Sequence, residues 1–379
     1  MDNYEYTNVL TDIYDKLCEF DEVEKAYRNA RKGKRYRPEV MAFADDLESN
    51  LINICNHLQW ETYEMGRYHP FYVHEPKLRL VMSLQFTDRI VQWDIYDKLY
   101  LFYDKMMIDD SYACRRGKGS HKAADRLQYW LRQVSRKSGK WYYLKLDISK
   151  YFYRVDHAIL EEILSRRIKD ERLMKLLHKI INSEDTRFGL PAGMSPDECS
   201  GDMWLWDVGM PIGNLTSQLF ANIYLNELDQ FCKHELHAHF YVRYMDDVII
   251  LSDSKKQLAE WKNEIAAFLD YNLHLELNEK TAIRPITLGI DFVGYKIWAT
   301  HRKLKKQTAR RMIRHVTVMS DLLARGEMSQ AEFDRAAASY RGVLQHCNSY
   351  GLRTKLNQIY AGSRKGGEQD GHANHESGT

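Results

Sequence analysis

The amino-acid sequence predicts a mixed α+β chain in which helical and strand-like stretches alternate along its length. Three observations support this class. Apolar residues recur at helical spacing through residues 1–66, short strand-like runs appear at 67–82, 141–148 and 240–251, and residues 302–360 return to a helical pattern. Two of the strand-like runs carry aspartates at an end or a turn, and these acids are candidates for catalytic or metal-binding residues.

Composition excludes several classes of protein. The 379 residues carry 55 Lys and Arg against 53 Asp and Glu, a formal net charge of +2, so any site for a polyanion must be local. No apolar run is long enough to span a bilayer, which predicts no membrane partner. The polar start at Met1–Glu5 does not look like a secretion signal, and six scattered cysteines without a CxxC pair favour reduced thiols in the cytoplasm.

The first 66 residues are predicted to be helical, because apolar positions recur at Val9–Leu17 and again at Leu47–Ile54. Between these segments lies the basic turn Arg31–Arg37, which is followed by Pro38. Proline suits the first turn of a helix, so a helix is expected to begin there. The turn itself is either a solvated connection or a loop that contacts phosphate.

The elements beyond residue 66 are predicted from periodicity and from turn residues. In order, they are strands at 71–73 and 78–82, a helix capped by Thr87-Asp88, helices at 122–135 and within 157–182, a long loop at 184–208, a helix at 219–228, strands between 240 and 298, and helices at 302–360. Residues 361–379 have no large apolar group and are predicted to be disordered.

The sharpest local signal is a pair of adjacent acids between two apolar strand-like runs at 240–251. This pattern predicts a hairpin with Asp246 and Asp247 at its turn. Adjacent carboxylates in an apolar setting repel each other and lose solvent, and a divalent cation removes both costs. The alternative is an Asp-Asp turn that faces solvent.

A second strand at 141–148 ends in another acid, Asp147. If Asp147 packs beside Asp246 and Asp247, three carboxylates can serve two Mg²⁺ ions. Two such ions clamp the attacking and leaving oxygens of an in-line phosphoryl displacement. Mg²⁺ prefers few carboxylates together with substrate phosphates, which agrees with this sparse set.

These residues resemble the palm of reverse transcriptases. Tyr244-Met245-Asp246-Asp247 matches the YxDD box of that family, and Leu144–Phe152 matches its first carboxylate motif, in the same order along the chain. The resemblance covers roughly residues 20–355. It implies a right-hand polymerase with an N-terminal helical extension at 1–66, fingers and palm at 67–295, a helical basic thumb at 296–360 and a disordered tail at 361–379.

The resemblance also implies roles for the acids and their neighbours. Asp147, Asp246 and Asp247 would be the catalytic residues, and together with Ile148 they would hold two Mg²⁺ ions, for which Mn²⁺ can substitute. The predicted product is cDNA copied from an RNA template, with a DNA or RNA primer and deoxynucleoside triphosphates as the other substrates.

Seven residues are predicted by resemblance to contact the incoming nucleotide. They are Lys77, Arg79, Phe152, Ile212, Gly213, Gln218 and Lys280. Phe152 would exclude a ribose 2′-hydroxyl and so select deoxynucleotides. The other interpretation is structural for each of them: a surface cation for Lys77, Arg79 and Lys280, a core ring for Phe152, and an ordinary loop and helix start around Gly213.

A further set is predicted to contact nucleic acid. It comprises Arg115, Arg116 and Lys118 in a basic glycine loop, Gly294 and Tyr295 in a hairpin that resembles the primer grip, and Arg302, Lys305, Lys306 and Arg310 in the thumb. Residues 296–320 hold eight Lys or Arg and no acid. Such a run is usually a solvated face, but it lies where a polymerase thumb grips a duplex.

The form Ile212-Gly213 with Ser217-Gln218 is similar to the reverse transcriptases of diversity-generating retroelements. This resemblance implies an error-prone enzyme that miscopies template adenines, works with a small basic pentameric accessory protein, and acts in the cytoplasm of a bacterium or a phage-infected cell. Two alternatives stay open at this point. One is a standalone defence-associated or retron-like reverse transcriptase, and the other is an RNA-binding scaffold without catalysis.

Overall fold

The computed structural model describes residues 8–73, 79–183, 185–191 and 193–369. The chain divides into two compact units that are each built from separated stretches. The first unit comprises residues 1–117, 144–250 and 256–282, and the second comprises 118–143, 251–255 and 283–379. Residues 118–143 pack with the C-terminal part of the chain, and the predicted domain boundaries at 66 and 295 stay a prediction.

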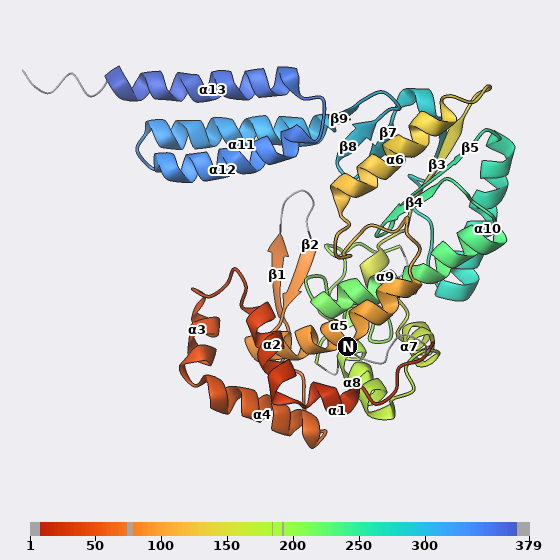
Figure 1. Ribbon diagram of the computed structural model, residues 1–379, viewed down its shortest axis with the longest axis vertical. Helices are drawn as coiled ribbons and strands as arrows, with labels where there is room; N and C mark the ends of the chain where they lie inside the picture. Colours follow the sequence, from red (N-terminus) through yellow and green to blue (C-terminus); the bar gives the residue numbers. More distant parts are fainter. Residues whose placement is uncertain (1–7, 74–78, 184, 192, 370–379) are drawn as a thin grey trace, which may run out of the picture. The chain divides into compact units, whose positions relative to one another are not determined.

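The N-terminal part of the first unit is helical, as predicted (Figure 1). Its helices are α1 (Tyr14–Leu17), α2 (Phe20–Ala30), α3 (Pro38–Asp45) and α4 (Leu47–Gln59). Pro38 is the first residue of α3, where its fixed φ suits the helix and its missing N–H costs nothing. The buried faces of α2 and α4 pack against each other, and α2 also packs along α5 (Phe86–Met106).

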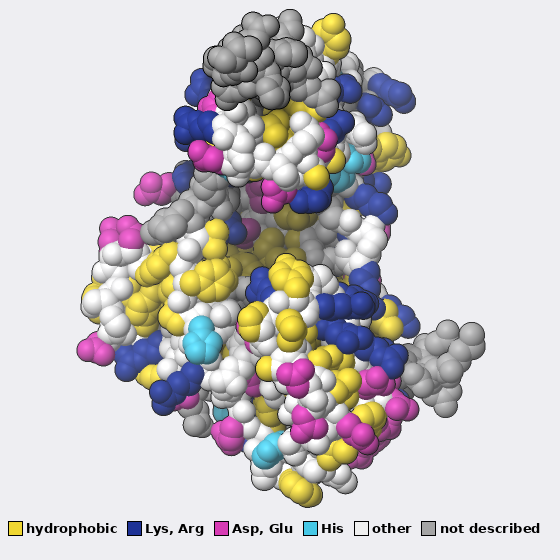
Figure 2. All heavy atoms as spheres, turned by 90° about the vertical axis from the view of Figure 1, so that its left-hand side faces the viewer, with side chains coloured by type: hydrophobic (Ala, Val, Ile, Leu, Met, Phe, Trp, Pro, Cys, Tyr) yellow, Lys and Arg dark blue, Asp and Glu magenta, His cyan; other side chains and the backbone are white. Residues whose placement is uncertain are grey.

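An antiparallel hairpin precedes α5 and consists of β1 (His69–Val73) and β2 (Arg79–Ser83). Every residue of β1 is exposed, and Figure 2 shows hydrophobic side chains on the face that carries it. The helix α5 begins at Phe86, before the predicted cap. That prediction is wrong because Asp88 lies inside the helix and is buried, where it accepts hydrogen bonds from the Tyr63 hydroxyl and the Gly66 amide.

A four-stranded sheet carries the acids, with the strand order β4-β5-β3-β6. Its strands are β3 (Tyr142–Asp147), β4 (Tyr241–Tyr244), β5 (Asp247–Ser252) and β6 (Ala282–Pro285). The helices of this region are α7 (His157–Ser165), α8 (Glu171–Ile181), α9 (Leu215–Gln230) with its π-helical continuation η3 (Phe231–Glu235), and α10 (Lys255–Leu273). Helix α9 packs on α5 and α7. The predicted mixed class with antiparallel strand pairs is confirmed.

Helix α10 was not among the predicted elements, although its signal is present in the sequence. Leu258, Ile265, Leu269 and Leu273 are buried at helical spacing. The sequence pattern at both ends of 240–298 predicts strands, and the helix between them is therefore not predicted.

The long loop at 184–208 is held down by its aromatic and apolar residues. Phe188 belongs to a buried cluster with Tyr68 and Leu80, and Trp204 packs against this cluster. The Trp206 ring is 45% exposed and lies under the Arg187 guanidinium, 4.8 Å from its carbon to the ring centre. Trp204 therefore anchors the loop.

The second unit combines a small antiparallel sheet with helices. Its elements are α6 (Ser120–Val134), β7 (Ile290–Phe292), β8 (Tyr295–Ile297), β9 (Arg302–Leu304), α11 (Lys306–Ala324), α12 (Gln330–Gln345) and α13 (Tyr350–Gln369). Helix α11 packs against α12 and α13, and Phe333 lies in their shared core (Figure 1). Helix α13 continues to Gln369, so residues 361–369, which the sequence predicts to be disordered, are helical. Residues 370–379 of the predicted tail lie outside the described part. None of the helices in the described part is both long and apolar enough to cross a bilayer.

Candidate active site

The two adjacent acids lie at the turn of the predicted hairpin. Strands β4 and β5 pair antiparallel, with Val242 opposite Ile249 and Tyr244 opposite Asp247. Met245 closes the turn with a φ of 54°, in the left-handed region that few side chains adopt. The backbone at the turn is therefore strained, and something outside the turn must hold it there.

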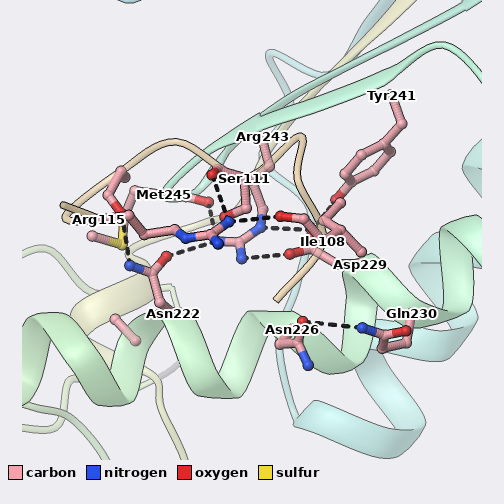
Figure 3. Close-up of polar contacts among 12 residues, drawn as sticks. Ile108, Ser111, Arg115, Asn222, Asn226, Asp229, Gln230, Tyr241, Arg243 and Met245 are labelled. Atoms are coloured by element: carbon pink, nitrogen blue, oxygen red, sulfur yellow. Dashed lines mark hydrogen bonds and ion pairs between the residues drawn. The ribbon is translucent and has the colours of Figure 1, made fainter. Parts of the chain in front are cut away.

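A buried arginine next to the turn provides this support (Figure 3). The Arg243 side chain is 0% exposed, and its Nε and Nη2 donate to the two carboxylate oxygens of Asp229 at 2.7 and 2.6 Å. Its Nη1 donates to the Met245 carbonyl at 3.1 Å and to Asn222 Oδ1 at 3.2 Å. The Tyr241 hydroxyl completes the group by donating to Asp229 at 2.6 Å. The arginine thus links the strained turn to helix α9.

The same arginine lies against the segment that follows α5. The Arg243 amide donates to the Asp110 carbonyl, and the Tyr112 amide donates to the Arg243 carbonyl. The Asn222 amide group donates to the Ala113 carbonyl at 2.8 Å. The hairpin, helix α9 and residues 110–113 are therefore held together by hydrogen bonds around one buried cation.

The acids themselves lie close enough to influence each other. Burial, together with the Asp147 and Asp247 carboxylates, raises the pKa of Asp246 to about 6, and Arg79 acts in the opposite direction. Crowded acids of this kind favour a proton or a metal ion, because either one removes the repulsion. Arg79 lies in β2, so the structure brings this predicted nucleotide-binding residue within electrostatic reach of the catalytic acids.

Asp247 has a cation beside it in the sheet. The Lys145 Nζ lies 2.7 Å from Asp247 Oδ1, and both side chains are about one quarter exposed, at 23% and 25%. Lys145 belongs to β3, which neighbours β5, and it precedes Asp147 by two residues. The sequence reasoning did not single out this lysine, although its position on an alternating strand next to an acid was visible.

The residues fit a divalent metal ion by their chemistry. Carboxylate and main-chain oxygens are the donors that Mg²⁺ prefers, and Mg²⁺ takes few of them from protein. Among the described residues, no three His, Cys, Asp or Glu side chains are already gathered as a ligand cage. Asp147, Asp246 and Asp247, with the Ile148 main chain, would hold the metal, and Asp247 is paired with Lys145 in this structure.

The main chain of Asp147 is fixed by the segment that carries another predicted residue. The Asn278 amide donates to the Asp147 carbonyl at 2.7 Å, and the Asp147 amide donates to Thr281 Oγ1 at 3.4 Å. Lys280 lies between these two contacts and is exposed. It is therefore close in the chain to the groups that hold Asp147, and its nucleotide contact stays a prediction.

Other predicted nucleotide contacts fall on two segments of the first unit. The Ile212 carbonyl accepts from the Met82 amide, and Gly213 has a φ of 121°. A Cβ added at Gly213 would lie 2.9 Å from Val81 Cγ1, so only glycine fits against β2. Phe152, in the short helix Tyr151–Tyr153, and Gln218 are both partly exposed. Lys77 lies outside the described residues.

Several residues predicted to contact nucleic acid have protein partners. The Arg115 side chain is 6% exposed, pairs with Asp104 and donates to three main-chain carbonyls. Arg302 pairs with Asp125 at 2.7 Å, and its side chain is 11% exposed. Tyr295 is buried and shares a hydrogen bond with His121 at 3.1 Å. These three side chains are largely buried against their protein partners. Nucleic acid could therefore reach them only by displacing those contacts.

The rest of the predicted set is more open. Arg116 pairs with Asp97 and lies over the Tyr100 ring, with about half of its side chain exposed. Gly294 forms the predicted β7–β8 turn with a φ of 85°. The remaining members are partly or fully exposed: Lys118, Lys305, Lys306 and Arg310. Contact of these residues with nucleic acid stays a prediction.

Comparison with known proteins identifies the family of the chain. The chain belongs to the reverse transcriptase (RNA-dependent DNA polymerase) family, whose profile matches residues 74–297. This match covers both strands that carry the acids, the helix α9 and the hairpin of β7 and β8.

Two relatives and one solved structure illustrate the similarity. Protein YkfC of Escherichia coli (strain K12) is 28% identical over 255 residues, which cover 58% of this chain and 63% of YkfC. The group II intron-encoded protein LtrA of Lactococcus lactis subsp. cremoris is 23% identical, over 93% of this chain and 72% of LtrA. The structure of apo telomerase from Candida tropicalis aligns with a TM-score of 0.46 at 12% identity, over 80% of this chain and 62% of that one. The chain thus spans less than two thirds of the length of YkfC.

Proposed function

We propose that this chain is an RNA-directed DNA polymerase that copies an RNA template into cDNA. The observation that carries the proposal is the placement of Asp246 at a strained hairpin turn beside Asp147 and Asp247, in a chain of the reverse transcriptase family. Acids crowded in this way favour a bound divalent cation, and phosphoryl transfer between nucleotides uses such cations.

Each part of the site has a role in this proposal. Asp147, Asp246 and Asp247 would hold Mg²⁺, which when bound supplies charge neutralisation for the attacking and leaving oxygens. Arg79 neutralises a nucleoside triphosphate, because its exposed guanidinium already acts electrostatically on Asp246. Ile212 and Gly213 lie against β2 and support the base pair, since Gly213 leaves no side chain in the way of a close approach.

The test is primer extension on a defined RNA template with Mg²⁺, using the wild-type chain and the double variant Asp246→Ala/Asp247→Ala. We expect the wild type to extend the primer and the double variant to lose at least about 1,000-fold in rate, because the metal loses its ligands. Circular dichroism checks that the variant is folded. A folded double variant that still extends the primer at the wild-type rate would contradict the proposal.

Sugar selection is assigned to Phe152. Its main chain is fixed, since the Phe152 carbonyl accepts from the Met210 amide at 2.7 Å, while its ring is partly exposed. A rigid ring beside the nucleotide leaves no room for a 2′-hydroxyl. Phe152→Ala is expected to raise ribonucleotide incorporation relative to deoxynucleotide incorporation by about tenfold or more, the scale of a pocket that loses a steric clash. Primer extension with each nucleotide set measures this ratio, and an unchanged ratio would remove Phe152 from the role.

A finer assignment is the mutagenic enzyme of a diversity-generating retroelement, which works with a small basic accessory protein. Ile212 with Gln218 supports it, because both side chains are partly exposed and could touch the base pair. Sequencing the cDNA from the same reactions tests this assignment. Frequent errors opposite template adenines support it, whereas faithful cDNA favours a defence-associated or retron-like enzyme. RNA binding without extension, even with the accessory protein added, favours a silent scaffold.

A further inference from the structure

The site contains a cation of its own that the reaction scheme above does not use. Lys145 lies in β3 between Leu144 and Leu146, whose side chains are both fully buried. Side chains alternate along a strand, so Lys145 and Asp147 lie on the same face while the two leucines point to the other. The lysine is therefore on the side of the sheet that carries the catalytic acids.

The contact of Lys145 is directed at one acid. Its Nζ is 2.7 Å from Asp247 Oδ1, which makes the two side chains an ion pair. Burial and the carboxylates of Asp147 and Asp247 raise the pKa of Asp246. The cation that lowers it is Arg79, which lies on another strand. The structure thus treats the two neighbouring aspartates differently, since Asp247 is held by a lysine and Asp246 faces other acids.

A lysine beside a carboxylate neutralises the negative charge, which a bound metal ion would also do. An ammonium group is a compact point charge on a flexible stem, so it can neutralise an acid and then swing away. About one quarter of each side chain is exposed, which leaves Lys145 a path to solvent. An arginine would hold Asp247 more rigidly through its planar fork.

We propose that Lys145 is an internal counter-ion for Asp247 that a divalent metal ion must displace, and that it thereby sets the metal affinity of the site. The inference rests on the proposed polymerase function and deepens it by naming what competes with the metal. In the metal-free chain the lysine reduces the repulsion among Asp147, Asp246 and Asp247. With a metal ion bound, Asp247 would no longer need this counter-ion and could act as a ligand together with Asp147 and Asp246.

The proposal predicts opposite effects on folding and on metal binding when the charge is removed. In Lys145→Gln the acids lose their counter-ion, so the metal-free chain becomes less stable and the metal binds more tightly. Lys145→Arg keeps the positive charge beside Asp247 and serves as the matched control. A purely structural lysine would lower stability without improving metal binding.

The experiment measures Mn²⁺ binding to the full chain in the absence of nucleic acid, by the electron paramagnetic resonance signal of free Mn²⁺. We expect Lys145→Gln to bind with a dissociation constant about two- to fivefold lower than wild type, the range that a partly exposed ion pair supports. Lys145→Arg should bind as the wild type does or more weakly. In an Asp247→Asn background, the glutamine substitution should change the affinity by less than about twofold, because the pair it breaks is already absent. Equal or weaker binding by folded Lys145→Gln would overturn the proposal.

Two further measurements separate this inference from the proposed function. Asp246→Asn should remove the tight Mn²⁺ site, and if the wild type shows no site that depends on Asp246, both the metal site and the role of Lys145 are overturned. If the wild type binds Mn²⁺ and extends a primer but Lys145→Gln shows no gain in affinity, the polymerase proposal stands and the counter-ion proposal fails. Thermal unfolding in excess chelator checks that Lys145→Gln is folded and records its expected loss of stability.

Discussion

Two aspartates on neighbouring helices of the first unit are buried to a similar degree and have opposite surroundings. Asp229 of α9 is 0% exposed and accepts two hydrogen bonds from Arg243 and one from Tyr241. Asp94 of α5 is 2% exposed, and within the described part of the chain neither of its carboxylate oxygens has a hydrogen-bond partner. Burial raises the pKa of Asp94 to about 8, with Lys98 opposing the shift.

The comparison teaches that burial alone does not say what an acid does. Asp229 is paired with an arginine, and the pair fixes the turn that carries Asp246. Asp94 avoids the cost of a buried charge by keeping its proton. Asp246 lies between these extremes: it is partly exposed, its neighbours are acids, and its pKa is raised to about 6. An acid in that state is one that a metal ion can stabilise.

The largest expected effect comes from breaking the buried pair on one side only. Arg243→Met leaves Asp229 charged without its main partner, so the free energy of unfolding should fall by about 3–5 kcal/mol. Urea denaturation followed by circular dichroism measures this change. The double variant Arg243→Met/Asp229→Leu removes both charges and should recover most of the loss. A single variant as stable as wild type, or a double variant as unstable as the single, would show that the pair does not support the turn.

The second effect is a pH dependence assigned to Asp94. Its folded pKa of about 8 lies above its usual value of 3.8, so the folded state holds the proton more tightly than the unfolded state. The stabilisation is complete below about pH 4 and is lost as the pH rises towards 8. Asp94→Asn does not titrate, so between pH 5 and pH 8 the wild type should lose up to about 4 kcal/mol relative to this variant. Urea midpoints of both chains at the two pH values check this, and parallel midpoints would contradict it.

The third effect is smaller and concerns Asp246. The same sign applies, so without metal the wild type loses stability relative to Asp246→Asn between about pH 4 and pH 6. At pH 7 in excess chelator the variant should be more stable by about 1–3 kcal/mol, although it is expected to lose activity. Added Mg²⁺ should stabilise only the wild type. A variant that is less stable than the wild type in chelator would mean that the acids do not repel each other.

Much of the fold follows from local pattern. The hairpin at 240–251 and the helical N-terminus were predicted correctly, because period-2 and period-3.6 spacing are properties of short segments. Where two signals competed, the prediction failed. Asp88 suits a helix cap by type, but it turns inward to Tyr63 and Gly66, and α10 was hidden between two strand-rich stretches.

The site divides in the same way. The acids Asp147, Asp246 and Asp247 could be identified from their strands and their order, since a carboxylate at a strand end or turn is visible in the sequence. The ion pairs of Arg115 and Arg302 could not be identified from the sequence. A basic residue in a loop looks the same in the sequence whether it binds phosphate or an acid far away in the chain. Tertiary packing brings Asp104 next to Arg115 and Asp125 next to Arg302.

By itself the sequence determined the class of the fold, the positions of the three acids on their strands and the family to which the chain belongs. Only the tertiary structure decided which charges are neutralised within the protein: Arg243 pairs with Asp229, Lys145 holds Asp247, and Asp94 stays without a partner among the described residues. The physical reason is that secondary structure depends on neighbours in the chain, whereas the free energy of a charge depends on the solvent it loses and the opposite charge it meets in space.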